Sequence, residues 1–280
     1  MKKILLSILI VAMVVVGVVG MMACTNEPTV KVIEIKLTEE EYAIGVKKGN
    51  TELLGQINSA MDALKADGTV DKIMQKYFAG EEVEGIVSAK KDSSKDQLVV
   101  ATNAEFEPFE YMMGDKFAGI DMEIAKAIAD QLGKELVIEN MVFDAVVTSV
   151  GAGLADMAIA GLTVTPKRAE SVDFSKSYYN ASQMIIVKAD DTTFDNCKTA
   201  DDVVNVLKGL TGKKAGYQNG TTGGYYIKGD EEWGFEGFAN ITPSGYDNAG
   251  LAVKDMVNGN IDLVVVDQMP AMSIAKTMNK

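Results

Sequence analysis

The chain has 280 residues, a formal net charge of −13 and 47% hydrophobic residues. Such an acidic balance argues against a nucleic-acid partner, which requires a basic face. The sequence has no histidine, which excludes Ser-His and Cys-His catalysis and zinc sites built on imidazole. We therefore expect no metal and no cofactor.

The N-terminal residues have the layout of a secretory signal peptide. Two lysines precede an uncharged apolar run over residues 4–20, which ends shortly before Cys24. We expect a signal peptide over residues 1–23, acylation of Cys24, and a lipid tether over residues 24–29. The protein would then lie outside the cytoplasm, anchored to the outer face of the cell membrane. A plain transmembrane anchor of roughly 20 apolar residues is the alternative.

The next segment contains strands and helices that have no obvious packing partner. Alternating apolar residues predict strands over residues 32–37 and 42–46. Asn50 is expected to cap a helix that ends at Gly68, and a second short helix follows. These elements cannot bury all their apolar faces alone. Residues 79–97 are charged and small, and they predict a linker that is not part of a core.

From Leu98 onward, apolar strands alternate with amphipathic helices. Unbroken apolar strands in this alternation are typical of parallel sheets that helices cover on both faces. The fold class is therefore α/β, with two lobes. We expect strands over residues 98–102, 136–139, 157–160, 184–187, 214–217 and 261–266, and helices over residues 119–132, 143–152 and 248–258.

Several stretches of this region resemble the extracellular amino-acid-binding proteins of ABC importers, including the glutamine-, arginine- and lysine-binding members. They are VVATNAEFEPFEY (99–111), FAGIDMEIAKAIADQLG (117–133), FDAVVTSVGAGLADMAIAGLTVTPKRAESVDFSKSYY (143–179), GYQNGTTGGYY (216–226) and VKDMVNGNIDLVVVDQMPA (253–271). The resemblance implies a type II, periplasmic-binding-protein-like fold. In that fold two lobes, each a mainly parallel sheet flanked by helices, are joined by two hinge strands.

The order of the segments departs from the family. In the family, a piece like EEEYAIGVKKGNTELLGQINSAMDALKADGTVDKIMQKYF ends the chain, whereas here it occupies residues 39–78. We therefore expect a circular permutation, which domains tolerate when their termini are close and exposed. The large lobe would comprise residues 43–78 and 98–177, and residues 79–97 would join the usual termini. The small lobe would comprise residues 30–37 and 184–280, and the hinge strands residues 38–42 and 178–183.

The resemblance also implies a site for a free amino acid, in which each charge of the ligand needs a partner. Arg168 would bind the carboxylate bidentately, with help from Thr163 and from Thr221 and Thr222, which lie in a turn that opens a helix. Asp267, at the end of a strand, would pair with the ammonium, and Gly161 would offer it a carbonyl. The other expected ligand-binding residues, at the side-chain end, are Asn103, Glu105, Phe106, Phe143 and Gln218.

Simpler roles stay open for these residues. Arg168 could lie on the surface, Asp267 could cap the next segment, the phenylalanines could belong to the core, and Glu105 could be solvated. A phosphate-binding loop at residues 220–223 is disfavoured, because no Gly-Lys-Ser/Thr follows.

The predicted function is capture of a polar or basic L-amino acid (arginine, lysine or glutamine) by a monomeric, non-enzymatic lipoprotein that delivers it to an ABC permease. Lobe closure on the ligand is the expected mechanism. One alternative is an enzyme on the same fold, such as a cyclohexadienyl dehydratase-like protein. Another is an amino-acid sensor domain.

Overall fold

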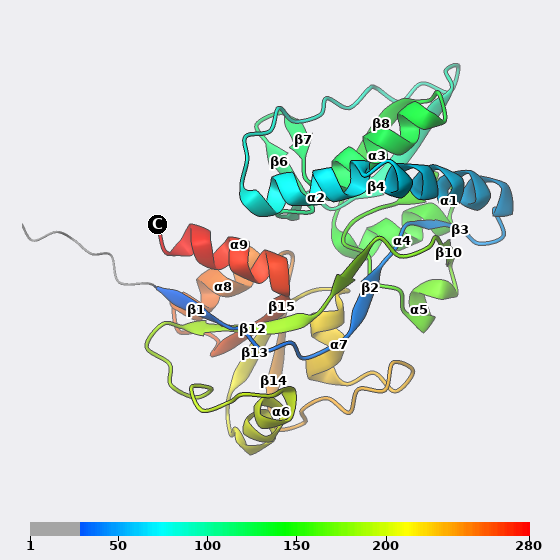
Figure 1. Ribbon diagram of the computed structural model, residues 1–280. Helices are drawn as coiled ribbons and strands as arrows, with labels where there is room; N and C mark the ends of the chain where they lie inside the picture. Colours follow the sequence, from blue (N-terminus) through cyan, green and yellow to red (C-terminus); the bar gives the residue numbers. More distant parts are fainter. Residues whose placement is uncertain (1–28) are drawn as a thin grey trace, which may run out of the picture.

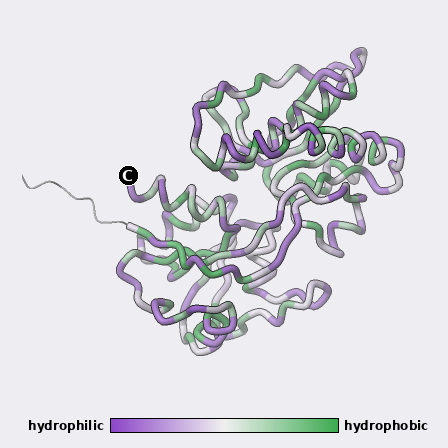
Figure 2. The backbone as a smooth tube through the Cα atoms, viewed as in Figure 1, coloured by the Kyte–Doolittle hydropathy of each residue, from purple (hydrophilic) through white to green (hydrophobic). Residues whose placement is uncertain are grey.

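The computed structural model describes residues 29–280, and in this range the chain forms two α/β lobes that lie against each other (Figure 1). The predicted signal peptide, Cys24 and residues 24–28 of the tether lie outside the described residues. Apolar chain segments concentrate in the strands and polar segments in the outer loops (Figure 2). Within residues 29–280, no helix is both long and apolar enough to span a membrane.

The large lobe is built on a five-stranded sheet. Its strands in spatial order are β10 (Val172–Phe174), β3 (Gly45–Lys47), β9 (Met157–Ala158), β4 (Gln97–Thr102) and β8 (Glu135–Asn140). One face packs on helices α1 (Thr51–Ala66), α2 (Thr69–Ala79) and α3 (Ile120–Gln131), and the other on α4 (Phe143–Gly151). The short helix α5 (Pro166–Ala169) precedes β10, and a small separate sheet contains β5 (Glu105–Phe106), β6 (Glu110–Met113) and β7 (Lys116–Ala118).

The small lobe has a second five-stranded sheet with the same layering. Its strands in spatial order are β1 (Val30–Ile33), β12 (Gln183–Lys188), β15 (Leu263–Asp267), β13 (Lys214–Gln218) and β14 (Thr242–Tyr246). Helices α8 (Ala249–Val257) and α9 (Gln268–Met278) cover one face, and α6 (Ala200–Gly209) and α7 (Thr222–Lys228) cover the other.

The α/β class and the two flanked sheets agree with expectation, but each sheet is mixed instead of mainly parallel. In the large lobe β4 is parallel to β8 and β9, whereas β3 is antiparallel to both of its neighbours. In the small lobe β13 is parallel to β14 and β15, whereas β12 is antiparallel to β1 and β15. The antiparallel strands β3 and β12 each follow directly on a segment that crosses between the lobes. Parallel neighbours need a crossover connection, usually a helix, and within residues 29–280 no helix precedes these two strands in their lobes.

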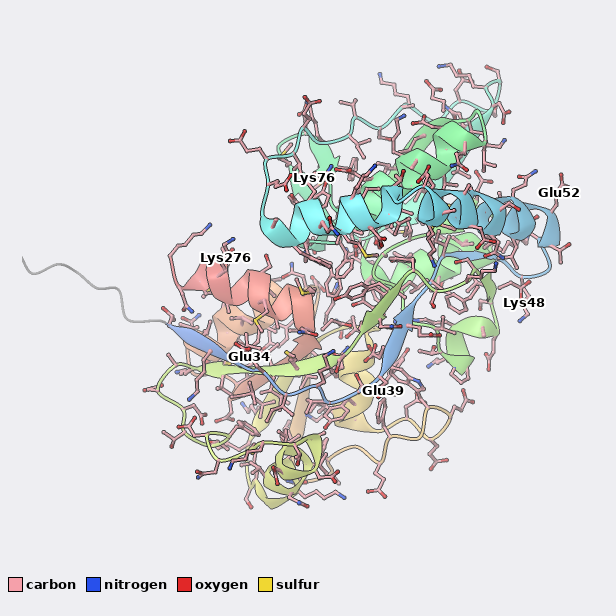
Figure 3. All side chains as sticks on the ribbon, viewed as in Figure 1. Glu34, Glu39, Lys48, Glu52, Lys76 and Lys276 are labelled. Atoms are coloured by element: carbon pink, nitrogen blue, oxygen red, sulfur yellow. The ribbon has the colours of Figure 1, made fainter. Side chains whose placement is uncertain are left out.

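Two short strands cross between the lobes side by side. Strands β2 (Glu40–Tyr42) and β11 (Tyr179–Ala181) pair antiparallel, with Tyr42 opposite Tyr179 and Glu40 opposite Ala181. The first crossing segment also carries Glu34 and Glu39, which are labelled in Figure 3. The strand predicted over residues 32–37 is shorter than expected, because β1 ends at Ile33 and the chain then leaves the sheet toward the crossing.

The early helices find their packing partner in the large lobe. Asn50 caps α1 by accepting a 3.2 Å hydrogen bond from the backbone N–H of Leu53, as its position before the helix predicts. The inward faces of α1 and α2 pack with α3 in one apolar cluster. This cluster includes Ile57, Met61, Leu64, Val70, Ile73, Ile124 and Ile128.

The segment over residues 79–97, predicted as a linker, runs along the large lobe, and its apolar residues pack against the core of that lobe. Ile86 exchanges two backbone hydrogen bonds with Phe117, of 2.6 and 2.8 Å, and the N–H of Ala89 donates to Leu136. Val83 and Ile86 pack against the apolar cluster. The exposed edges of β7 and β8 supply the backbone partners that hold this segment in place.

The end of the chain lies beside the first described strand. The Asn279 side-chain oxygen accepts hydrogen bonds from the N–H groups of Thr29 and Val30, at 2.7 and 3.0 Å. The Asn279 amide donates to the Val30 carbonyl at 2.9 Å. The C-terminus of α9 and the start of β1 are therefore in direct contact.

Candidate functional site

A narrow cavity with about 10 Å³ of free space lies where the two lobes meet. Its lining residues are Asn103, Phe106, Phe143, Gly161, Thr163, Arg168, Gln218, Thr221, Thr222 and Asp267. All ten belong to the set expected from the sequence, so the structure gathers side chains that are far apart along the chain. Their role in binding a ligand stays a proposal.

Asn103 and Gln218 face each other across the cavity. Asn103 follows β4, is 4% exposed, and donates a 2.8 Å hydrogen bond to the Met141 carbonyl. Its side-chain oxygen accepts a 2.8 Å bond from the Gln218 amide at the end of β13. This bond joins the large lobe to the small lobe at the edge of the cavity.

Gly161 and Phe106 form a tight apolar contact in the large-lobe wall. Gly161 has a φ of +51°, and a Cβ at this position would lie 2.8 Å from the Phe106 ring. A side chain is therefore excluded there. The Gly161 N–H donates a 2.7 Å hydrogen bond to Asp121, which is fully buried behind the cavity.

Arg168 is 6% exposed and held by both lobes. Its guanidinium donates to the Thr163 carbonyl at 2.6 Å and to the Gly220 carbonyl of the small lobe at 3.0 Å. It also lies over the Phe143 ring, 5.2 Å from the centroid. Burial lowers the pKa of the Arg168 guanidinium from its ordinary value, but a guanidinium stays protonated in proteins. Arg168 is thus a fixed cation in the cavity wall.

The small-lobe residues lie at the carboxyl ends of neighbouring strands. Strands β13 and β15 are parallel, so Gln218 and Asp267 end at the same edge of the sheet. In α/β sheets this edge is where ligands bind. Thr221 precedes α7 as its N-cap residue, and Thr222 is the first residue of that helix.

Asp267 is a buried carboxyl, 5% exposed. Its Oδ1 accepts a 2.7 Å hydrogen bond from the Tyr42 hydroxyl. Burial and the nearby Glu40 carboxylate raise the pKa of Asp267 above its ordinary value. A cation placed beside Asp267 would reverse that shift, because an opposite charge favours the ionised form.

Glu105 is placed differently from the other expected residues. It is exposed and lines a neighbouring groove of about 450 Å³ between the β5–β6 hairpin and the helices α8 and α9. Its carboxylate accepts a 3.2 Å hydrogen bond from the Asn248 amide of the small lobe. The structure therefore puts Glu105 at the contact between the lobes, outside the smaller cavity.

Three buried polar residues next to the cavity were missed in the sequence: Glu40, Tyr42 and Gln183. Glu40 is 4% exposed, and Tyr42 and Gln183 are fully buried. The signal for Glu40 was the strand alternation itself, since side chains two apart share a face. With Tyr42 inward, Glu40 must also point inward and Glu41 outward.

The cavity combines a fixed cation, a carboxyl group and two aromatic rings in one buried space. A buried ionic ligand needs a counter-charge for each of its own charges. Arg168 and Asp267 supply one of each sign, while Phe106 and Phe143 supply apolar surface. This chemistry suits a small zwitterion.

Known proteins of the same kind match this chain in sequence and in structure. The profile of the bacterial extracellular solute-binding proteins, family 3, matches residues 7–80 and 98–270. The arginine-binding extracellular protein ArtP of Bacillus subtilis is 36% identical over 137 residues, which are 49% of this chain and 49% of ArtP. ABC transporter arginine-binding protein 1 of Escherichia coli is 30% identical over 62% of this chain and 65% of its own length.

The chain thus spans about half of ArtP and just under two thirds of the second relative. Among solved structures, an ancestral arginine-binding protein bound to glutamine aligns with a TM-score of 0.55 at 32% identity. That alignment covers 65% of this chain and 74% of the other. An ancestral amino-acid-binding protein, described as a precursor of cyclohexadienyl dehydratase, aligns with a TM-score of 0.55 at 28% identity. The chain belongs to the bacterial extracellular solute-binding proteins, family 3.

Proposed function

We propose that this protein captures a polar or basic L-amino acid between its lobes and delivers it to an ABC import permease. The observation that carries the proposal is the presence of Arg168 and Asp267 in one buried cavity where the lobes meet. The two arginine-binding relatives support an amino-acid ligand. Arginine, lysine and glutamine are the candidates.

In the proposed complex Arg168 holds the ligand carboxylate and Asp267 the ammonium. Gly161, Thr163, Thr221 and Thr222 line the end of the cavity that holds these charged groups. The ligand side chain lies between Phe106 and Phe143, toward Asn103 and Gln218, with Glu105 at the outer contact between the lobes. A second buried carboxyl group, Glu40, lies at the end of the cavity that holds the charged groups, because it accepts hydrogen bonds from Thr163 and Thr222.

The proposed transport role includes an anchor. Cys24, directly after the apolar run of residues 4–20, would carry the lipid that holds the monomer at the outer face of the membrane. Substitution of Cys24→Ser should abolish labelling by a radioactive fatty acid and release the protein into the medium. Labelling that persists in this variant contradicts the anchor.

The proposed architecture is a circular permutation of the family fold, with the lobe, hinge and linker boundaries given above. The contact of Asn279 with Val30 supports it, because the join requires these residues to be neighbours. A reordered chain, residues 82–280 followed directly by residues 29–81, tests it. We expect this chain to fold and to bind amino acids within about threefold of the original affinity. A control with the same join but a cut inside α1, between Ser59 and Ala60, should not fold.

Calorimetric titration with each of the twenty amino acids tests the function, followed by recovery of the bound ligand. We expect tight, one-to-one binding of arginine, lysine or glutamine and recovery of the ligand unchanged. The dehydratase alternative predicts turnover of an aromatic precursor. Absence of binding to every amino acid contradicts the proposal.

A further inference from the structure

The carboxylate of Glu40 lies at the centre of a buried polar cluster at the junction of the lobes. It accepts hydrogen bonds from the Thr38 hydroxyl at 2.7 Å and from the Gln183 amide at 3.0 Å. It also accepts bonds from the hydroxyls of Thr163 at 2.8 Å and Thr222 at 2.9 Å. We call these five residues the hinge cluster.

The members of the hinge cluster come from different parts of the fold. Thr38 and Gln183 lie at the two crossing segments, Thr163 lies in the large lobe, and Thr222 begins α7 of the small lobe. Glu40 therefore connects both lobes and both crossings through one carboxylate. Hydrogen bonds to an ionised acceptor are roughly twice as strong as neutral ones. These contacts therefore contribute strongly to the relative position of the two lobes.

The bonds of Glu40 also determine where two cavity-lining hydroxyls point. A threonine hydroxyl has a single proton, and both Thr163 and Thr222 donate theirs to Oε2 of Glu40. The Gln183 amide donates to the Thr222 oxygen at 3.0 Å, which fixes that hydroxyl further. In this closed arrangement neither proton is available to a carboxylate in the cavity, which leaves Arg168 as its cationic donor.

We propose that Glu40 is a positioning residue that stabilises the closed arrangement of the lobes. Its bonds to Thr163 and Thr222 come from opposite lobes, so they exist together only when the lobes meet. The apparent affinity for the ligand is the affinity of the closed state multiplied by the fraction of the protein in that state. Glu40 therefore affects the apparent affinity through that fraction, without touching the ligand. The affinity part rests on the proposed amino-acid binding, whereas the effect on lobe closure can be measured separately.

The sequence provides matched controls on either side of Glu40. Glu39 and Glu41 flank Glu40 and are exposed, so Glu39→Gln and Glu41→Gln remove the same charge without disturbing the hinge cluster. Glu40→Gln keeps the size of the side chain but puts an amide where donors already converge. A second variant, Thr222→Val, removes the small-lobe hydroxyl at almost constant shape.

The experiment measures the distance between the lobes by pulsed electron resonance. Spin labels at Lys72→Cys on α2 and Asp201→Cys on α6, both exposed positions, report closure in a full chain with both natural cysteines replaced by serine. Circular dichroism establishes that each variant is folded, and calorimetry with arginine, lysine and glutamine gives affinity.

We expect Glu40→Gln and Thr222→Val to shift the distance distribution toward the longer, open distances and to weaken amino-acid binding about tenfold, in line with loss of hydrogen bonds to a charged group. The two flanking controls, Glu39→Gln and Glu41→Gln, should behave as the unchanged protein. If Glu40→Gln retains the original distances, or if the unchanged protein shows no short distance with or without amino acid, the proposal is wrong. A protein that closes but binds no amino acid contradicts the proposed function alone.

Discussion

The Tyr42 hydroxyl donates a 2.7 Å hydrogen bond to the Asp267 carboxyl, although the two residues are 225 positions apart in the chain. Tyr42 lies on the crossing strand β2, and Asp267 ends strand β15 of the small lobe. The Tyr42 ring is fully buried and packs edge-on against Phe109, with the ring centroids 5.1 Å apart. The segment connecting the lobes therefore orients the acid that we propose as the partner of the ligand ammonium.

This bond predicts that Tyr42→Phe weakens amino-acid binding by about tenfold or more. The ring and its packing remain, but Asp267 loses a donor that stabilises its ionised form, and hydrogen bonds to charged groups are worth about 1.5–3 kcal/mol. Calorimetric titration gives the affinity. Tyr246→Phe removes a comparable bond, to Asp255 away from the cavity, and should leave the affinity unchanged; equal losses in both variants would refute the role of Tyr42.

The raised pKa of Asp267 predicts that ligand binding releases protons. Burial and Glu40 raise this pKa in the protein without ligand, whereas an ammonium beside the carboxylate lowers it. Affinity is therefore fully present above the raised pKa and falls as the pH drops through it. Calorimetry in two buffers with different ionisation enthalpies should show release of part of a proton near that pKa. Proton uptake, or no buffer dependence in that range, contradicts this assignment.

Asp121 predicts a pH dependence of stability in the large lobe. It is fully buried, and burial raises its pKa to about 7 even though the Gly161 N–H and the Tyr178 hydroxyl donate hydrogen bonds to it. The folded protein thus binds more protons than the unfolded chain between the ordinary value of 3.8 and about 7. Its contribution to stability is present below that range and is lost as pH rises through about 7.

Asp121→Asn should therefore flatten the fall in stability with rising pH, by at most about 1.4 kcal/mol per pH unit for a single proton. Urea unfolding between about pH 4 and pH 8 measures the slope. Buried Glu110 lies near Asp121, and its pKa is also raised. It therefore adds to the pH dependence of stability in both the unchanged protein and Asp121→Asn. Asp115→Asn, at an exposed turn, is the control. An Asp121→Asn slope equal to that of the control is the outcome that counts against this prediction.

Much of the fold could be predicted because periodicity and capping act locally. The helix after Asn50 and the strands around Leu98 and Leu263 follow from their own residues. Strand pairing is not local in this way. The antiparallel pairing of β12 with β1, and the packing of Ile86 on Phe117, depend on tertiary partners that no short window contains.

The cavity residues could be proposed from the motifs that resemble the family. What motif matching could not supply was the partner of each side chain. Thr163 and Thr222 were expected to serve a ligand carboxylate, yet their hydroxyls donate to Glu40. The run of three glutamates does not itself show which one is buried, and only the inward direction of Tyr42 on the same strand decides it.

Binding of L-arginine to the unchanged protein and to Arg168→Gln tests the central claim most directly. Arg168 is buried beside the exposed Lys167, so Lys167→Gln removes the same charge one residue away. Loss of one partner from a buried charge pair costs about 2–5 kcal/mol, which predicts at least about thirtyfold weaker binding for Arg168→Gln. Equilibrium dialysis with labelled arginine, lysine and glutamine should show that loss for each ligand that binds, with Lys167→Gln close to the unchanged protein. Equal affinities for the unchanged protein and Arg168→Gln would contradict amino-acid capture in this cavity.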